Sequence, residues 1–281
     1  MAEQLDDRTG RSPLRVAILG VTGRMGRALI AALDESQSAV LKGASASANS
    51  RWLGQDAAAA LGGPARDVTI TADPALAIRE ADVAIDFTLP EATAANVSAC
   101  VSAQRPLVIG TTGLARETLA QIEQAARHIP IVHAPNMSLG VNLLLKLVEL
   151  AGRTLDAGYD IEIFEAHHRN KKDAPSGTAL ALGAAAARGR GVKLEDVAEY
   201  ARHGTPEARR RGAIGFSVFR GGDVVGDHTV TFAGLGERIE LTHRASDRLA
   251  FARGAVKAAG WVVKQRPGLY TMQDVLGFSL P

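Results

Sequence analysis

Residues 16–27 read Val16-Ala17-Ile18-Leu19-Gly20-Val21-Thr22-Gly23-Arg24-Met25-Gly26-Arg27. An apolar run, a glycine-rich turn and the start of an amphipathic stretch predict a buried strand that leads into a helix. Such a turn lets the backbone approach a pyrophosphate, and the helix N-terminus offers free N–H groups and a partial positive charge to hold it. The spacing is G-x-x-G-x-x-G, one residue off the usual G-x-G-x-x-G. A turn that only packs helix against strand is therefore the alternative.

The alternation of short apolar runs with amphipathic, Ala-rich stretches continues from Leu14 to about Met137. It predicts a parallel α/β sheet covered by helices on both faces. The expected strands are Arg15–Leu19, Val40–Ala46, Val68–Thr71, Val83–Phe87, Leu107–Ile109 and Ile131–His133. The expected helices are Arg24–Leu33, Ala75–Arg79, Glu91–Ala103 and Arg116–His128, with Pro106 and Pro130 stopping the last two.

The pattern changes after Asn136. It predicts a helix at about Val141–Thr154, a strand Asp160–Ala166 and a helix from Ser176. Antiparallel strands are expected between Ala213 and His243, with turns at Gly221-Gly222-Asp223 and Gly234-Leu235-Gly236. A final helix, Arg248–Lys264, precedes a tail punctuated by Gly and Pro. The fold class is thus α/β, with an N-terminal doubly wound, Rossmann-type parallel sheet and a second α+β domain.

The bulk composition bounds the class of protein. The 281 residues are 46% hydrophobic and 22% charged, as in a globular protein. The chain has 32 Lys and Arg and 30 Asp and Glu, so its overall charge does not indicate a nucleic-acid or membrane partner. The longest apolar stretch, Leu139–Leu150, is too short to cross a bilayer. The single cysteine, Cys100, is expected as a small core residue in a reducing compartment, which favours the cytoplasm. The polar first twelve residues are expected to be a frayed leader rather than a secretion signal.

Two further turns follow expected strands at the edge where ligands of open α/β sheets bind. Gly110-Thr111-Thr112-Gly113 and Ala134-Pro135-Asn136-Met137 are placed to close over a nicotinamide, although each is also an ordinary turn-forming tetrapeptide.

A Rossmann site usually carries an acid about twenty residues after its glycine loop, where it binds the ribose hydroxyls. Here the stretch after the second strand is Ser45-Ala46-Ser47-Ala48-Asn49-Ser50-Arg51, which has none. With hydroxyls, an amide and Arg51 nearby, NADPH is expected to be at least as acceptable as NADH. A solvated loop that contacts nothing is the alternative.

A charged cluster follows the strand of the second domain. His167, His168, Lys171 and Lys172 lie within six residues and precede Asp173-Ala174-Pro175-Ser176-Gly177-Thr178. A helix start with Ser, Gly and Thr offers hydroxyls and free N–H groups to a carboxylate, and the cations add charge. Histidine passes protons near neutrality, and lysine holds a carboxylate or donates a proton. The cluster predicts an anionic substrate; a solvated basic loop is the alternative.

The basic residues allow two further functions, metal binding and RNA binding. A metal site would use this pair of histidines and the distant His203, His228 or His243. No metal is expected, because adjacent histidines on a strand point to opposite sides and no cysteine or close carboxylate completes a shell. The run Arg209-Arg210-Arg211 has no interleaved aromatics, so a solvated face or an oligomer salt bridge is expected rather than an RNA site.

These residues together resemble the dihydrodipicolinate reductase family. The resemblance runs through Gly20–Gly26, Gly110–Gly113, Ala134–Asn142, the block Glu165–Ala179, Gly212–Gly215, Arg220–His228, Thr242–Ala250 and the ending Gly268-Leu269-Tyr270. It covers nearly the whole chain after residue 14. The block H-H-x-x-K-x-D-A-P-S-G-T is its most specific part.

The resemblance implies a dinucleotide-binding domain, 1–138 completed by 248–281, and a substrate-binding and oligomerisation domain, 139–247, that usually builds a homotetramer. Family members reduce a cyclic dicarboxylate, 4-hydroxy-tetrahydrodipicolinate, to tetrahydrodipicolinate in lysine and diaminopimelate biosynthesis, with NADH or NADPH. By position, His167 is implied as the acid/base residue and Lys171 as the proton donor. The residues implied to contact the substrate are His168, Gly177 and Thr178, together with the neighbouring Ser176. Gly20–Met25, Gly110–Thr112 and Ala134–Met137 are implied as cofactor contacts.

One departure bears on the cofactor. Many members carry an acid at the end of the second strand, where this chain has Ser47 and Ala48. This favours NADPH over NADH. Two rivals stand beside the family reading: another NAD(P)-dependent reductase of an amino-acid-like substrate, and a non-catalytic NADPH-sensing protein. The histidine-lysine block separates them, since a generic dehydrogenase has no reason to carry it.

Overall fold

The structure is a computed structural model that describes residues 12–59, 62–204 and 206–278. The leader expected in the first twelve residues lies, Ser12 apart, outside the described residues. The chain divides into two compact units. The first is Met1–Pro135 with Ala255–Thr271, and the second is Asn136–Gly254 with Met272–Pro281.

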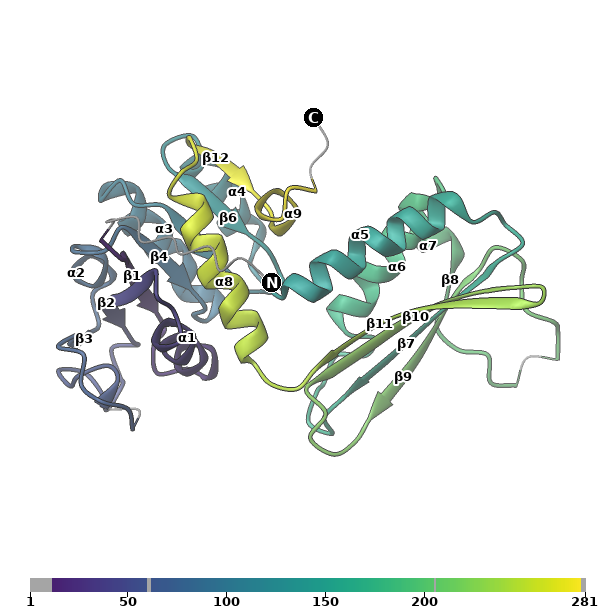
Figure 1. The fold of residues 1–281 in the computed structure, drawn as a ribbon, viewed down its shortest axis with the longest axis horizontal. Coiled ribbons are helices and arrows are strands. Elements are labelled where there is room, and N and C mark those ends of the chain that lie inside the picture. The colour runs from purple at the N-terminus through teal and green to yellow at the C-terminus, as the bar shows by residue number, and fades with distance from the viewer. Residues whose placement is uncertain (1–11, 60–61, 205, 279–281) are drawn as a thin grey trace, which may run out of the picture. The chain divides into compact units, whose positions relative to one another are not determined.

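The first unit is built on a seven-stranded, fully parallel sheet (Figure 1). Its strands are β1 (Leu14–Leu19), β2 (Ala39–Ser45), β3 (Ile70–Thr71), β4 (Val83–Asp86), β5 (Leu107–Ile109), β6 (Pro130–His133) and β12 (Gly268–Tyr270). They are ordered β12-β6-β5-β4-β1-β2-β3. Six of them follow the Rossmann order 3-2-1-4-5-6, which places the topological switch point between β1 and β4. The expected fold class is confirmed.

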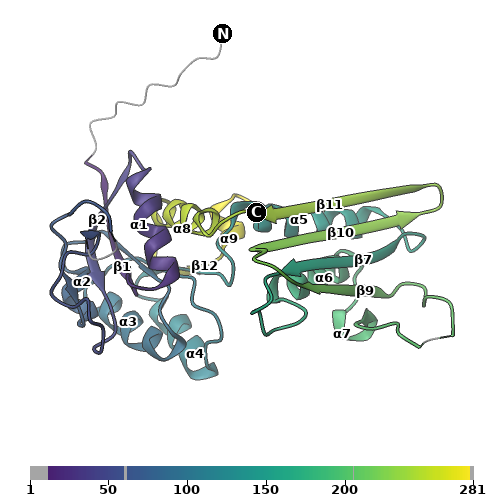
Figure 2. The same cartoon turned by 90° about the horizontal axis from the view of Figure 1, so that it is seen from below.

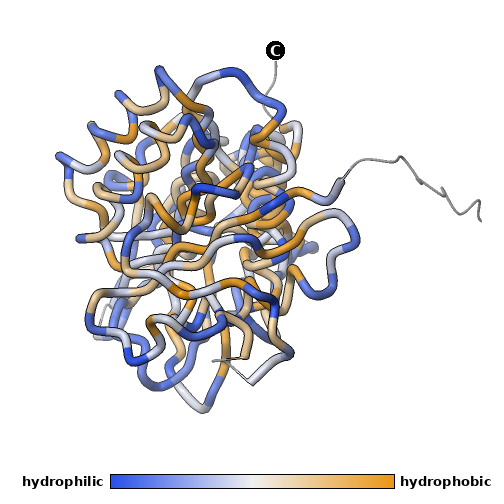
Figure 3. Tube along the Cα trace, turned by 90° about the vertical axis from the view of Figure 1, so that its left-hand side faces the viewer, coloured by the Kyte–Doolittle hydropathy of each residue, from blue (hydrophilic) through white to orange (hydrophobic). Residues whose placement is uncertain are grey.

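Helices α1 (Arg24–Asp34), α2 (Pro74–Ile78), α3 (Pro90–Ser102), α4 (Arg116–Ala125) and α8 (Leu249–Val262) accompany this sheet. The central strands are apolar throughout because both faces are buried; Ile18, Ile85 and Ile109 have no exposed surface. In Figure 3 the hydrophobic stretches of the trace lie inside this unit and the hydrophilic ones at its outer turns.

The end of α4 differs from the expectation. The helix stops at Ala125, and the N–H groups of Arg127 and His128 bond three residues back, so the chain tightens into turns before Pro130. Pro130 does not stop the helix; it is the first residue of β6. The tail holds two elements that the sequence did not predict, β12 at the sheet edge and α9 (Met272–Val275). At three and four residues, both are too short to show a periodic pattern.

The second unit pairs one mixed sheet with helices on one face (Figures 1 and 2). Its strands are β7 (Asp160–His167), β8 (Ala198–Glu199), β9 (Ile214–Arg220), β10 (Gly226–Gly234) and β11 (Glu237–Ala245), in the order β11-β10-β7-β9-β8. Its helices are α5 (Leu139–Thr154), α6 (Gly177–Gly189) and α7 (Leu194–Val197), besides α9. Val148 and Leu182 of the helices pack with Ile214 and Phe232 of the sheet in one buried core.

The strand order corrects one expectation. The hairpin across Leu235-Gly236 is present, with β10 and β11 antiparallel. However, β9 and β10 do not pair with each other: β7 lies between them, parallel to β9 and antiparallel to β10. The turn at Gly221-Gly222-Asp223 therefore joins strands on either side of β7. Alternation along a strand shows which face is buried but not which strand is its neighbour.

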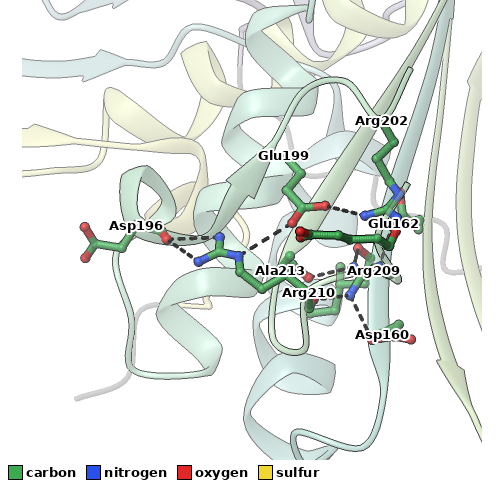
Figure 4. Close-up of polar contacts among 10 residues, drawn as sticks. Asp160, Glu162, Asp196, Glu199, Arg202, Arg209, Arg210 and Ala213 are labelled. Carbon is green, nitrogen blue, oxygen red and sulfur yellow. Dashed lines mark hydrogen bonds and ion pairs between the residues drawn. The ribbon is translucent and has the colours of Figure 1, made fainter. Parts of the chain in front are cut away.

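The run of three arginines agrees only in part with the expectation of a solvated face: Arg210 and Arg211 are exposed, whereas Arg209 is half-buried and paired within the chain. Arg209 pairs with Asp160 at 2.8 Å and with Glu162 at 2.9 Å (Figure 4). Its guanidinium also donates to the carbonyls of Ile161 and Ala213. Arg210 lies 3.5 Å from Glu199. The side chain of Arg209 thus links the start of β7 to the segment before β9 by contacts within one chain.

In the described part of the chain, no helix combines the length and the apolarity that a bilayer crossing requires.

Candidate functional site

The glycine loop lies between β1 and α1, next to the switch point. Gly20 has φ +82°, and a Cβ there would lie 3.0 Å from Cγ2 of Thr88. A Cβ on Gly26 would lie 2.2 Å from the carbonyl oxygen of Val21, so Gly26 is required by packing of α1 on the loop. At Gly23, the N-cap of α1, no side chain caps the helix, and its first turn holds no acid. The N–H groups at this helix start are therefore left to an anion, as a bound pyrophosphate needs.

The ends of β2 and β4 meet this loop. The N–H groups of Gly20 and Val21 donate to the carbonyl of Ser45 at 3.0 and 2.9 Å. Beside them, the fully buried carboxylate of Asp86 accepts from the Thr88 N–H at 2.8 Å, the Thr88 hydroxyl at 2.6 Å and Asn96 at 3.1 Å. Asp86 was missed by the sequence reasoning, although an acid that ends an apolar strand run was a usable signal.

The turn after β5 is fitted closely against β4. The hydroxyl of Thr111 lies 3.4 Å from the carboxylate of Asp86, and Thr111 is buried. A Cβ on Gly110 would lie 2.2 Å from the ring of Phe87, so this position needs glycine for packing. Thr112 and Gly113 are exposed. The Gly110–Gly113 turn thus lies at the carboxyl edge of the sheet.

The loop after β2 carries no acid. Ser47 and Ala48 are exposed, and the guanidinium carbon of Arg51 lies 4.5 Å from the ring centroid of Trp52. The loop offers hydroxyls and one cation, and its first carboxylate is Asp56, which accepts four backbone N–H groups of its own loop.

The tetrapeptide Ala134–Met137 is divided between the two units. Ala134 belongs to the first unit, where its N–H donates to the carbonyl of Ile109 at 3.1 Å. Asn136 belongs to the second unit, where its amide donates to the Thr178 hydroxyl at 3.1 Å and its side-chain oxygen accepts from the Ser138 N–H. Pro135 is exposed and Met137 is buried. Asn136 is therefore tied to a residue predicted to bind substrate.

The charged cluster at the end of β7 forms one connected group. His167 is 8% exposed, and its Nδ1 lies 2.5 Å from Glu165 on the same strand. The ring of His167 contacts that of His228 edge to face, with centroids 5.1 Å apart. Burial lowers the pKa of His167 below its usual 6.5, and Lys171 and Arg220 lower it further, against the opposing effect of Glu165. The imidazole is thus mostly neutral near neutral pH and able to accept or return a proton.

The start of α6 faces open space. Ser176 caps the helix by accepting from the Ala179 N–H at 3.2 Å. Gly177 is exposed, and a Cβ there would meet no atom within 4 Å, so neither packing nor a positive φ requires glycine. The N–H groups of a helix start favour a carboxylate, and the carboxylate of Asp173 interacts with that of Gly177.

Lys171 lies at the same helix start through Asp173. Its Nζ is 3.0 Å from the Asp173 carboxylate, whose pKa is lowered by Lys171 and by the Gly177 N–H in spite of partial burial. The N–H of Lys171 donates to the carbonyl of His168, which is half-buried, whereas Lys172 is exposed. Lys171 and the start of α6 therefore both contact one carboxylate, that of Asp173.

Three further residues belong to this group: the sequence assigned no site role to Glu165 or Arg220, and it considered His228 only as a possible metal ligand. His228 is 4% exposed, its Nε2 lies 3.1 Å from the Ser176 hydroxyl, and burial, with a smaller effect of His167, lowers its pKa to about 4. They lie on β7, β9 and β10, so only the strand order brings them together. Among the described residues there is no group of three or more histidines, cysteines and acids arranged to hold a metal ion.

Comparisons with known proteins agree with this geometry. Residues 14–137 match the family model described as the N-terminus of dihydrodipicolinate reductase, and residues 140–276 match its C-terminus. A 4-hydroxy-tetrahydrodipicolinate reductase of Thiobacillus denitrificans is 54% identical, over 95% of this chain and 99% of the relative. One of Dinoroseobacter shibae is 55% identical over 93% and 97%. A solved dipicolinate-bound dihydrodipicolinate reductase from Paenisporosarcina sp. TG-14 superimposes with a TM-score of 0.72 at 25% identity, covering 94% of this chain and 99% of that one. The two family models together cover almost the whole described chain, and the chain belongs to the dihydrodipicolinate reductase family.

Proposed function

We propose that this nicotinamide-dependent reductase converts 4-hydroxy-tetrahydrodipicolinate to tetrahydrodipicolinate in lysine and diaminopimelate biosynthesis, with NADPH preferred over NADH. The observation that carries the proposal is the group at the end of β7: a buried histidine, a lysine and a helix start with an exposed glycine lie together. That combination suits a dianionic substrate that must gain a proton.

The glycine loop supports the cofactor assignment. The loop of residues 20–25 is proposed to hold the pyrophosphate, with the uncapped N–H groups of Arg24 and Met25 at the start of α1 as donors. Gly110–Thr112 and Ala134–Met137 are proposed to contact the nicotinamide end. When bound, the nicotinamide supplies the hydride.

The loop around Ser47 and Ala48 supports the preference for NADPH. No carboxylate there repels a 2′-phosphate, and Arg51 offers a cation. NADH lacks that phosphate and gains nothing from Arg51.

The substrate carboxylates are assigned to the second unit. One is proposed to lie against the N–H groups of Gly177 and Thr178 and the ammonium of Lys171, the groups that Asp173 approaches in this structure. Ser176 and His168 complete the proposed contacts. A solved relative that holds dipicolinate, a planar cyclic dicarboxylate, is in line with this assignment.

The proton is assigned to His167 with Lys171. Loss of the 4-hydroxyl as water leaves an unsaturated imine, and the reduction then adds one hydride and one proton to the ring. His167, buried beside the helix start, gives that proton from Nε2, and Lys171 holds the neighbouring carboxylate or donates in its place. The protein's own contribution is position and charge.

Replacing either residue tests the assignment. His167→Gln and Lys171→Ala are expected to lower kcat by about a hundredfold or more, the usual contribution of a general acid. NADPH binding, followed by fluorescence titration, is expected to change less than about twofold, because both residues lie in the second unit. If both variants keep the wild-type kcat, these roles are wrong.

We further propose a homotetramer and a cytoplasmic location. On the face of the second sheet away from its helices, Phe164 and Phe219 are 45% and 47% exposed, which favours self-association. The single cysteine, Cys100, is a buried free thiol, as expected in a reducing compartment.

A further inference from the structure

One buried carboxylate joins three parts of the second-unit site. Glu165 of β7 has no exposed surface. It accepts from Nδ1 of His167 at 2.5 Å, from the backbone N–H of Ser176 at 2.9 Å and from both terminal nitrogens of Arg220 at 2.7 Å. A single side chain therefore fixes the imidazole relative to the start of α6.

The contact also selects a tautomer of His167. An ionised carboxylate only accepts hydrogen bonds, so Nδ1 must carry a proton and Nε2 is the nitrogen left to exchange one. Nε2 makes no hydrogen bond with any residue that the structure describes. A Cβ on Gly226 would lie 3.0 Å from Nε2, so glycine at that position keeps room beside it.

Arg220 supplies the charge that keeps Glu165 ionised. Its two terminal nitrogens reach both carboxylate oxygens, and they also donate to the carbonyls of Phe219 and Asp173. Hydrogen bonds from Arg220, His167 and the Ser176 N–H hold the pKa of Glu165 below its usual value although burial opposes this. A buried carboxylate without such a partner would take up a proton.

We infer that Glu165 is a positioning residue for His167: it fixes the imidazole through Nδ1, ties it to the substrate-binding helix start and leaves Nε2 as the proton-transferring atom, while Arg220 maintains its charge. This rests on the proposed function only where His167 is said to hand a proton to substrate.

The charges of Glu165 and Arg220 act in opposite directions on the pKa of His167. The groups that face its ring are Glu165 on its own strand, Lys171, Arg220 on β9 and His228 on β10. Besides burial, Glu165 raises the pKa of His167, whereas Lys171 and Arg220 lower it. Removing the charge of Glu165 should lower this pKa, and removing that of Arg220 should raise it.

The test is a pH titration of His167 by NMR in protein labelled with ¹⁵N-histidine, with the signal assigned from His167→Gln. Glu165→Gln is expected to lower the pKa of His167 by about one unit or more, and Arg220→Gln to raise it. Glu162→Gln is the matched control, since Glu162 lies on the same strand and pairs with Arg209 at 2.9 Å. It should leave the titration of His167 unchanged.

Kinetics supply the second readout. In Glu165→Gln the alkaline limb of the kcat profile should move to lower pH and kcat near pH 8 should fall about tenfold or more, with the KM for NADPH unchanged. In Arg220→Gln the limb should move the other way. A residue that only supported the fold would not shift the two profiles in opposite directions.

Glu165→Gln leaves the half-buried guanidinium of Arg220 without its carboxylate partner, which could prevent folding. If that variant does not fold, the double variant Glu165→Gln/Arg220→Gln, which removes both charges, is used in its place. It still removes the charged hydrogen-bond partner of His167 Nδ1, so the pKa of His167 should again fall. An unchanged or raised pKa in either folded variant overturns the inference. Because the titration needs no substrate, a shifted pKa together with an unaffected kcat in His167→Gln would instead reject the proposed role of His167 in the reaction.

Discussion

At the scale of single residues, Gly177 stands at the start of α6, where substrate is proposed to bind and where no steric constraint requires a glycine. Gly177 has an ordinary φ and open space where a Cβ would be, and its N–H already attracts the carboxylate of Asp173. A glycine that packing does not require is best explained by access to its backbone.

Gly177→Ala therefore separates binding from folding. Alanine favours the helix and meets no neighbour, so the melting temperature should hold or rise. The added methyl group should obstruct the helix start and raise the KM for the dicarboxylate about tenfold, as read from initial rates. Gly260→Ala in α8, which also meets nothing within 4 Å, is the control and should keep the wild-type KM. A normal KM in Gly177→Ala would remove the helix start from the substrate site.

The sequence could predict residues that act within one segment. His167, Lys171 and Ser176–Thr178 lie in a single block, and the structure gathers Lys171 and Gly177 around Asp173. Arg220 could not be predicted as a partner of Glu165, because 55 residues separate them and they meet only through the pairing of β7 with β9.

At the scale of elements, the same limit holds. Apart from β12 and the end of α4, the strands and helices of the first unit were predicted to within two residues at each end, because buried parallel strands are continuous apolar runs with helices between them. The neighbours of β7 were not, since the turn at Gly221-Gly222-Asp223 suggested a hairpin that β7 interrupts. Short elements such as β8 and β12 carry too little pattern to be seen.

The strand pair β10–β11 carries a pH dependence of stability. His228 and His243 lie opposite each other, and burial lowers the pKa of both, that of His228 to about 4. The unfolded chain binds a proton at His228 near pH 6.5, which the folded chain refuses until about pH 4, so stability falls as the pH drops through that range. His228 alone accounts for at most about 3 kcal/mol of that loss.

Calorimetry from pH 7 to pH 4 checks this. The melting temperature of wild type should fall more steeply than that of His228→Gln, whose amide still reaches the Ser176 hydroxyl without titrating. The carboxylates are the same in both proteins, so the difference between the two melting-temperature curves reports the protonation of His228. Parallel curves would show that His228 is protonated in the folded state as easily as in the unfolded chain.

At the scale of the whole molecule, the second sheet leaves one face without helices (Figure 2). Phe164 on β7 and Phe219 on β9 lie on that face, between hydroxyl-bearing neighbours such as Ser217 and Thr229. Two exposed aromatic side chains on one face of a sheet favour association with further copies of the chain.

Phe164→Lys is expected to convert the proposed tetramer to smaller species, because a buried, unpaired ammonium is costly in an interface. Light scattering after size-exclusion chromatography measures the mass. Leu143→Lys on α5, where the leucine is 44% exposed, is the control and should leave the mass unchanged. A tetramer that survives Phe164→Lys would move the interface away from this sheet.

The central claim is that this chain carries hydride from a nicotinamide to a cyclic dicarboxylate. The most direct measurement is the rate of NADPH and NADH oxidation by the purified protein with freshly generated 4-hydroxy-tetrahydrodipicolinate. We expect oxidation that depends on substrate and a kcat/KM for NADPH above that for NADH, since the loop after β2 has no acid. No substrate-dependent oxidation with either cofactor, in protein shown to be folded, would contradict the account.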